Sequence, residues 1–298
     1  MIEIKDSGFF TLPVTAKRHF LERIGMPAGG PMDRIHAVLA NRIVGNPDDA
    51  ALLEAAFTLP GMVFNAPAAI AVVGGADSIR ILRNGIELSF PCGETIFTEA
   101  GDELVSDRVR RGLRAYIAFS GGLLYDCVRP EPVKMGDRLT IGQAQRPSAK
   151  KLNYDPLPYP EGRAALRVIE GVQSYHFSRE GKESFFCGEY TYTPQSDRMG
   201  IRLSGPSVGF RQGLDGNIIS EGMMPGDIQI PPNGQPIIMT ADCQTIGGYA
   251  KIAHVIEADL PLAAQLRPGD KITFRRVLVA DAHIAMRKLI MKADGSVG

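Results

Sequence analysis

The groups in this sequence that are best suited to chemistry are concentrated in one short stretch, ADCQTIGGY at residues 241–249. It carries an acid, a thiol, an amide and a hydroxyl in succession, followed by two glycines and a tyrosine: Asp242, Cys243, Gln244, Thr245, Gly247, Gly248 and Tyr249. One interpretation is an Asx-type turn that satisfies its own backbone. The other is the polar floor of a binding site, where the glycine pair turns tightly or lets backbone amides approach a ligand. The residues alone favour neither interpretation.

Long polar side chains also punctuate the apolar runs that precede this stretch. Glu221, Gln229 and Gln235 stand within or beside the runs DIQI and PIIMT, which have the composition of core strands. An unpaired buried polar group costs roughly 1 to 3 kcal/mol, so each of these side chains needs a partner. A bound ligand is one way to supply that partner.

Two arginines upstream offer a second kind of chemistry. Arg198 and Arg202 are four residues apart in SDRMGIRLSG, with Asp197 beside them. On a strand they would face the same way, and two planar guanidinium groups suit a carboxylate or phosphate clamp. Ordinary surface charges on an edge strand are the alternative that the spacing alone favours.

Composition and motifs exclude several classes of function. The 33 basic and 33 acidic residues cancel, so the chain lacks the basic field of a nucleic-acid binder. The charged start MIEIKDSGFF and the absence of a long apolar run predict a cytoplasmic protein with no membrane segment. The four cysteines and five histidines are scattered, which predicts free thiols and no metal site built by the protein.

The sequence also lacks the familiar devices for handling nucleotides or amides. The run nearest to a P-loop, SREGKES, has neither the upstream glycine nor a hydroxyl directly after its lysine. There is no serine-lysine amidase signature. Any chemistry on ATP or an amide must therefore use other groups.

The elements that must position these residues are predicted to be mainly β-strands with a few short helices. The 33 glycines and 21 prolines are spread between short apolar runs, as in a chain of many strands and tight turns. Asn84-Gly85 predicts a type I′ hairpin. A Gly-Asp pair recurs before apolar alternation in AGDEL, MGDRLTIG, PGDIQI and PGDKITF, where each pair predicts a turn that leads into a strand.

Three helices are expected. The first follows Asp33 as N-cap and stops at Gly45-Asn46, the second opens at Asp259, and the third occupies the tail ADAHIAMRKLIMKADG. Periodicity does not decide whether DDAALLEAAFTL is a helix or a buried strand. The proline-rich, aperiodic segment 146–163 predicts a linker between two domains, 1–145 and 164–298.

Three of these stretches together resemble a known family. GMPAGGPMDRIHAVLANRIVGN, SDRMGIRLSG and the long run from Ser220 through ADCQTIGGY to Ile256 are similar to the family called KipA or allophanate hydrolase subunit 2, which includes the C-type subunit of 5-oxoprolinase. The chain also resembles one half of the carboxyltransferase region of urea carboxylase. The similarity covers most of the chain in order and implies two cyclophilin-like β-barrel domains.

The resemblance also implies an activity and partners. The expected reaction is ATP-dependent opening of the 5-oxoproline lactam to glutamate, with ATP and Mg²⁺ as co-substrate of an assembled complex. A B-type, KipI-like subunit and an A-type subunit are the implied partners, and the substrate is a small amide. Biotin is not expected as a cofactor.

Site residues carried over by matching position fall into two groups. The catalytic candidates are Asp242, Glu221, Arg198 and Tyr249. The candidates for binding substrate or nucleotide are Gln229, Gln244, Thr245, Gly247, Gly248, Asp33 and Asn41. Arg198 and the amides of Gly247 and Gly248 would supply donors, and Asp242 or Glu221 would act as a base or bind Mg²⁺.

The sequence departs from the family pattern near its start, where an expected arginine is missing, in a shortened segment at 121–137, and at Lys251, where arginine is common. These differences leave two alternatives open. One is a regulatory subunit that binds the KipI-like partner without catalysis. The other is a component of a biotin-dependent carboxyltransferase.

Overall fold

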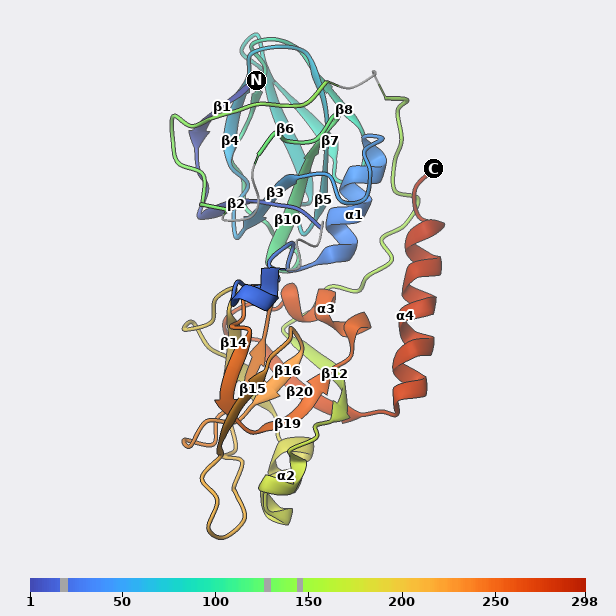
Figure 1. Cartoon of the computed structure of the whole chain (residues 1–298). Coiled ribbons are helices and arrows are strands. Elements are labelled where there is room, and N and C mark those ends of the chain that lie inside the picture. The colour runs from blue at the N-terminus through green and yellow to red at the C-terminus, as the bar shows by residue number, and fades with distance from the viewer. Residues whose placement is uncertain (17–20, 126–129, 144–146) are drawn as a thin grey trace. The chain divides into compact units, whose positions relative to one another are not determined.

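A computed structural model of the chain describes residues 1–16, 21–125, 130–143 and 147–298 (Figure 1). The chain divides into two compact units, each built from more than one segment. Unit 1 comprises Met1–Arg18, Asp33–Tyr159 and Met291–Gly298, and unit 2 comprises His19–Met32 and Pro160–Ile290. The segment predicted as a linker, 146–163, is grouped with unit 1 as far as Tyr159. Two isolated bridges hold it there, Glu94 with Lys151 and Leu152 with Val297.

The strands of unit 1 form two antiparallel sheets that share one hydrophobic core. The six-stranded sheet has the order β11-β1-β4-β9-β6-β7, with β11 (Arg138–Leu139), β1 (Ile2–Asp6), β4 (Gly61–Phe64), β9 (Glu103–Leu104), β6 (Ser78–Arg83) and β7 (Ile86–Pro91). The five-stranded sheet has the order β2-β3-β10-β5-β8, with β2 (Phe10–Val14), β3 (Leu52–Ala56), β10 (Arg114–Phe119), β5 (Ala68–Gly74) and β8 (Ile96–Thr98). Helix α1 (Arg34–Ile43) packs against β5 and β10.

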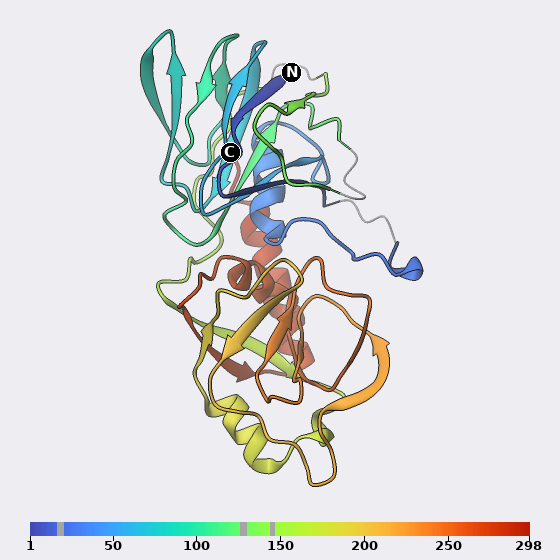
Figure 2. The ribbon, with the colours of Figure 1, turned by 90° about the vertical axis from the view of Figure 1, so that its left-hand side faces the viewer.

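Unit 2 is a closed seven-stranded barrel (Figures 1 and 2). Its strands run in the order β12 (Arg163–Glu170), β19 (Lys251–Val255), β16 (Asp227–Gln229), β17 (Ile237–Met239), β14 (Gly200–Ser204), β13 (Tyr190–Tyr192) and β20 (Lys271–Arg276). A parallel pairing of β12 with β20 closes the ring. A separate two-stranded sheet joins β15 (Asn217–Gly222) to β18 (Ile246–Tyr249). The prediction of a mainly β chain is confirmed. Unit 2 contains a closed barrel, whereas the strands of unit 1 form two sheets.

The helices are short apart from the last. Unit 2 contains α2 (Arg179–Cys187), which packs against β20, and α3 (Leu260–Ala264), which packs against β12. Short 3-10 helices are η1 (Leu21–Ile24), η2 (Ser174–His176) and η3 (Glu257–Asp259), and the last helix is α4 (Val279–Asp294). None of the helices in the described ranges is long and apolar enough to cross a membrane.

Several local predictions are confirmed. Asn84 and Gly85 adopt φ of 51° and 80° between β6 and β7, as a type I′ turn requires. Asp33 caps α1 by accepting a hydrogen bond from the backbone N–H of His36. Each Gly-Asp pair has its glycine at positive φ and lies at the entrance to β9, β11, β16 or β20.

The segment that periodicity left ambiguous is a strand. Leu52–Ala56 forms β3, which lies between β2 and β10 in the five-stranded sheet, and every residue of β3 is buried. A strand covered on both faces shows no alternation of apolar and polar residues, and the one polar residue of β3, Glu54, accepts a hydrogen bond from the hydroxyl of Tyr116 at 2.8 Å.

Candidate functional site

The outer face of the unit 2 barrel carries a cavity of about 540 Å³ where β14, β16 and β17 lie side by side. Ile228 of β16 and Ile230, which directly follows this strand, are core residues, so Gln229 between them points outward. The same alternation turns Arg202 of β14 outward, because Ile201 and Leu203 are core residues. The wall is completed by residues from neighbouring strands and turns: Thr193, Gln195, Met199, Gly200, Leu203, Pro231, Asn233, Gln235, Pro236, Ile237, Met239, Gln244 and Tyr249.

The register of these strands sets their outward side chains in a row. Arg202 is paired with Ile237, Ile237 with Gln229, and Gln229 with Lys251 of β19. The register shifts between Ile228 and Gln229, which leaves Ile252 as an extra residue on β19. Such a bulge re-aims the side chains next to it and is common beside functional sites. The row therefore presents a cation, an apolar side chain, an amide and a second cation on one face.

Gln229 is the predicted site residue with the most unusual environment. It is 5% exposed, and its Oε1 atom is buried without a hydrogen-bond partner among the described residues. Buried side-chain amides are nearly always paired, so an unpaired one calls for an explanation. In the sequence, Gln229 already stands out because it interrupts an apolar run and therefore needs a partner.

Gln244 and Tyr249 line the same cavity, whereas Thr245, Gly247 and Gly248 are not part of its wall. The carbonyl of Thr245 accepts a hydrogen bond from Met223 N at 2.9 Å. Gly247 and Gly248 lie in β18 and not in a tight turn, with Gly247 paired with Glu221 of β15. A Cβ on Gly247 would come within 2.8 Å of Met223 Cγ, so the glycine permits close packing of the two strands. Of the two alternatives for the glycine pair, the tight turn is wrong, because pairing with β15 extends this segment.

Arg198 and Asp242 form a bidentate ion pair. Arg198 Nε donates to Asp242 Oδ2 at 2.7 Å, and Nη2 donates to Oδ1 at 2.9 Å. Nη2 also donates to the carbonyl of Gly30 at 2.7 Å, and the Arg198 side chain is only 9% exposed. The Asp242 carboxylate therefore does not satisfy its own turn, contrary to the Asx-turn interpretation.

The two arginines of SDRMGIRLSG do not form one clamp. Arg198 precedes β14 and turns inward to Asp242, whereas Arg202 lies on β14 and faces the cavity. The clamp interpretation required them to share a face of one strand, and the start of β14 at Gly200 prevents this. The donors of Arg198 that were expected to serve a ligand are engaged by the protein.

Glu221 lies at one end of a chain of polar contacts beside the barrel. Its Oε1 accepts from Lys251 Nζ and from Gln173 Nε2, each at 2.5 Å. Lys251 Nζ also lies 3.8 Å from Asp227, whose Oδ1 is 2.9 Å from His254 Nδ1. The hydrogen bond from Lys251 is the main cause that lowers the pKa of Glu221. Glu221 is thus held as a carboxylate.

The sequence missed several members of this contact chain. Gln173, Asp227 and His254 were not predicted as site residues, although Asp227 belongs to one of the Gly-Asp turns. No local pattern marks Gln173, which reaches Glu221 across 48 residues of sequence. Lys251 was noticed only as a departure from the family pattern.

Cys243 is poorly suited to act as a nucleophile in this arrangement. It is buried, and burial raises the pKa of its thiol to about 12, with further raising by the charges of Asp227 and Asp242. The reactive form of cysteine is the thiolate, which this environment disfavours. Cys92, Cys187 and Cys243 are free, and Cys127 lies outside the described residues.

The remaining two predicted binding residues, Asp33 and Asn41, belong to unit 1 and have structural partners there. Asn41 donates to the carbonyl of Ala50 at 2.9 Å and accepts from Asn46. Asp33 caps α1 and contacts the ring of His36, whose Nε2 lies 3.1 Å from Asp155 Oδ1. Both residues therefore hold the ends of α1 in place.

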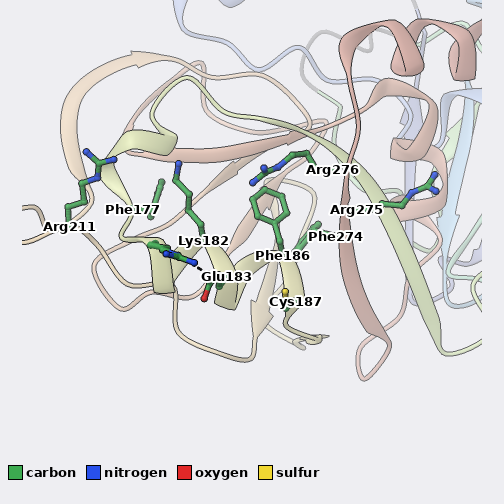
Figure 3. Close-up of a pocket in the computed structure, with 10 residues that line it drawn as sticks. Phe177, Lys182, Glu183, Phe186, Cys187, Arg211, Phe274, Arg275 and Arg276 are labelled. Carbon is green, nitrogen blue, oxygen red and sulfur yellow. Dashed lines mark hydrogen bonds and ion pairs between the residues drawn. The ribbon is translucent and has the colours of Figure 1, made fainter.

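A second cavity of about 660 Å³ lies beside α2 and β20 and contains none of the predicted residues (Figure 3). Its wall includes Arg179 and Lys182 from the SREGKES run, in which Ser178 caps α2. Arg276 lies over the ring of Phe186 at 4.1 Å. Glu170 offsets part of this basic charge, since it pairs with both Lys182 at 3.0 Å and Arg276 at 3.3 Å. The run that resembled a P-loop is therefore the capped start of a surface helix.

Among the described residues no three His, Cys, Asp or Glu side chains gather as metal ligands would. The first cavity instead offers amides, hydroxyls and one arginine above an apolar floor. Such groups bind a small polar molecule and stabilise charge on it by position.

The fold and the site define a class of protein. It is a mainly β protein with a closed barrel, and several polar residues of its sequence motif line a cavity on the barrel wall. The chain belongs to the family described as carboxyltransferase domain, subdomain A and B, whose model matches residues 24–276. It is 29% identical over 297 residues to the C-type subunit of 5-oxoprolinase from Escherichia coli, covering 95% of this chain and 93% of that protein. The corresponding 5-oxoprolinase protein of Haemophilus influenzae is 28% identical over 303 residues, covering 97% of this chain and 95% of that protein.

Larger proteins contain a similar region. The solved structure of the K. lactis urea amidolyase superposes with a TM-score of 0.88 at 27% identity, covering 98% of this chain and 20% of that chain. The urea amidolyase of Lachancea kluyveri is 29% identical over 287 residues, which is 85% of this chain and 15% of that protein. The expected family membership is confirmed, and the relatives are enzymes or subunits of enzymes.

Proposed function

We propose that this chain is the C-type subunit of an ATP-dependent 5-oxoprolinase-like amidohydrolase. With A-type and B-type, KipI-like subunits it would hydrolyse the C–N bond of the 5-oxoproline lactam to give glutamate, coupled to hydrolysis of ATP to ADP and phosphate. ATP would enter with Mg²⁺ as a co-substrate of the assembled, cytoplasmic complex.

The observation that carries this proposal is the meeting of three motif side chains at one cavity. Gln229, Gln244 and Tyr249 come from three different segments of the long motif, and all three line the cavity on the barrel wall. Their amide and hydroxyl groups suit a small neutral amide. The match to the Escherichia coli 5-oxoprolinase protein over nearly the full length of both chains supports the same substrate class.

The other candidates take supporting roles in this proposal. The Arg198–Asp242 pair ties residue 30 to the turn that leads into β18, and so shapes the approach to Gln244. Glu221 anchors Lys251, the neighbour of Gln229 in the strand register. Catalysis by this protein would then rest on positioning and electrostatics, since Cys243 is held as a thiol.

The test is ATP-dependent release of glutamate from 5-oxoproline by this protein mixed with its A-type and B-type companions. Activity should require all three proteins. The variants Tyr249→Phe and Gln244→Met should each lower kcat/KM by about tenfold or more, because each removes a polar group from the cavity. Gln212→Met, at an exposed loop residue outside the cavity, is the matched control and should behave as the wild type.

The outcome separates this proposal from regulation. A stable complex with the B-type protein that releases no glutamate, with any of the companions, would refute the enzyme-subunit role and favour a regulatory one. Circular dichroism of each variant establishes that a loss of activity is not a loss of fold.

A second candidate function is carboxyl transfer, and the family description and the urea amidolyase superposition favour it specifically. The chain would then act with a biotin-bearing protein supplied separately. Inhibition of the reconstituted activity by avidin distinguishes this candidate, because the 5-oxoprolinase-like reaction needs no biotin and is insensitive to avidin.

A further inference from the structure

Gln229 has a side-chain amide with no protein partner. Its Oε1 is buried and unpaired among the described residues, and none of them forms a hydrogen bond with its Nε2 either. Because the protein fixes neither end of this amide, it can present its carbonyl, its NH₂ group or both to a ligand. Replacement by an apolar residue of the same shape would remove the cost of burial, so the amide at this position needs another reason to be there.

We propose that the carboxamide of Gln229 recognises the edge of a cis amide, and that Arg202 binds an anionic group on the same ligand. This proposal rests on the proposed function and adds to it the residues that select the substrate. The ligand class is a lactam or similar cis amide that carries a carboxylate.

The geometry of amides supplies the selectivity. A carboxamide side chain presents a carbonyl oxygen and an N–H on one edge. A lactam ring holds its amide in the cis form, so its own N–H and carbonyl also share one edge, and the two edges pair through two hydrogen bonds. An open-chain secondary amide prefers the trans form by about 2.5 to 4 kcal/mol and presents these groups on opposite edges. Gln229 would therefore accept a lactam and reject a peptide bond.

The strand register provides the rest of the site. Arg202 is two strands away from Gln229, which places their Cα atoms about 10 Å apart. Ile237 lies between them, is partly exposed, and offers an apolar surface for ring methylene groups. The guanidinium group of Arg202 has no ion-pair partner in the described part of the chain, whereas Lys251 on the other side of Gln229 is paired with Glu221. A carboxylate on the ligand would therefore meet Arg202.

Ligands that differ by one group test this arrangement. We would measure binding to the assembled complex by calorimetry for 5-oxoproline, N-methyl-5-oxoproline, 2-pyrrolidinone and proline. The second lacks the N–H, the third lacks the carboxylate, and the fourth lacks the carbonyl. The wild-type complex should bind 5-oxoproline about tenfold or more tightly than each of the others, since each analogue loses a hydrogen bond or an ion pair.

The variants assign each preference to a residue. Gln229→Met should raise the KM for 5-oxoproline about tenfold or more and remove the preference over N-methyl-5-oxoproline. The complex that carries Arg202→Met should bind 5-oxoproline and 2-pyrrolidinone with equal affinity. Gln212→Met should retain the full pattern of preferences. A Gln229→Met complex that keeps the wild-type KM, or still rejects the N-methyl compound, overturns the proposal.

The experiment also separates failure of the two proposals. If the wild-type complex hydrolyses 5-oxoproline and Gln229→Met behaves identically, the recognition role is wrong and the proposed function stands. If the wild-type complex releases no glutamate, the proposed function fails, and the binding measured by calorimetry still decides whether Gln229 recognises a lactam. Binding of a lactam that Gln229→Met abolishes supports the recognition role, and no binding of any lactam refutes it.

Discussion

Asp242 accepts two hydrogen bonds from the guanidinium group of Arg198, which lies 44 positions earlier in the chain. The pair joins the turn at 241–245 to the start of β14, and the bond from Arg198 to Gly30 adds a third segment to the same joint. Because Arg198 is 9% exposed and Asp242 is 32% exposed, the carboxylate is the more accessible partner. Asp242 therefore supplies a carboxylate that compensates the charge of Arg198.

Replacement of Asp242 by alanine should lower the free energy of unfolding by about 2 to 4 kcal/mol, since it removes the carboxylate that accepts two hydrogen bonds from a nearly buried guanidinium. Urea denaturation of the full chain measures this. The double variant Arg198→Met with Asp242→Leu should recover part of the loss, because no buried charge then remains. An Asp242→Ala protein as stable as the wild type would show that the ion pair contributes nothing to the fold.

Gln173 and Gln229, both buried in unit 2, should respond oppositely to replacement by methionine. Gln229→Met removes an amide with no protein partner, so the free energy of unfolding should stay within about 0.5 kcal/mol of the wild-type value or rise. Gln173→Met removes the hydrogen bond to Glu221, so it should cost about 1 to 2 kcal/mol. Denaturation of both variants under the same conditions makes the comparison. A larger loss for Gln229→Met than for Gln173→Met would mean that Gln229 has a structural role.

The cysteines should differ sharply in reactivity towards iodoacetamide. Burial raises the pKa of both Cys92 and Cys243 to about 12, whereas Cys187 is exposed. At pH 8 the folded protein should be alkylated at Cys187, with Cys92 and Cys243 reacting only after addition of urea. Peptide mass spectrometry identifies the labelled positions.

The variant Cys243→Ser tests the role of this thiol in activity. It should retain the glutamate-releasing activity of the assembled complex within about threefold, because a thiol that stays protonated does not act as the nucleophile. Rapid alkylation of Cys243 in the folded wild-type protein would contradict the expected low reactivity of this thiol. Loss of activity in Cys243→Ser would contradict the expectation that the thiol is not the nucleophile.

The sequence was sufficient wherever a short segment decides its own conformation. The Asn84-Gly85 hairpin, the Asp33 cap and the Gly-Asp turns all follow from the φ preferences or hydrogen bonds of a few adjacent residues. Gln229 was also identified from its immediate neighbours, because a long amide inside an apolar run must find a partner. These inferences needed no knowledge of how the strands pair.

Contacts between distant segments could not be predicted in this way. The row formed by Gln229, Ile237 and Arg202 exists only because β16, β17 and β14 are adjacent in the barrel with one particular register. Asp259 was expected to cap the helix that follows it, but its carboxylate accepts hydrogen bonds from Arg167. Both features depend on residues that are remote in sequence.

The buried histidine of unit 1 gives a prediction for the dependence of stability on pH. The His36 ring is fully buried between Asp33 and Asp155 and stacks on Tyr159. Burial lowers the pKa of His36, but the charges and hydrogen bonds of the two carboxylates outweigh it and raise the pKa to about 10. His36 therefore carries a charge in the folded protein at neutral pH.

Because the folded-state pKa lies above the ordinary value near 6.5, folding is favoured by proton binding. This contribution is fully present below about pH 6.5 and is lost as the pH rises to about 10. The free energy of unfolding of the wild type should fall by a few kcal/mol across this window, as measured by urea denaturation at a series of pH values. His36→Gln, which cannot titrate, should be less stable at pH 7 and show a flatter profile between pH 7 and pH 10. Parallel profiles for the two proteins would mean that His36 is neutral in the folded state, and that Asp33 and Asp155 hold it by hydrogen bonds without an ion pair.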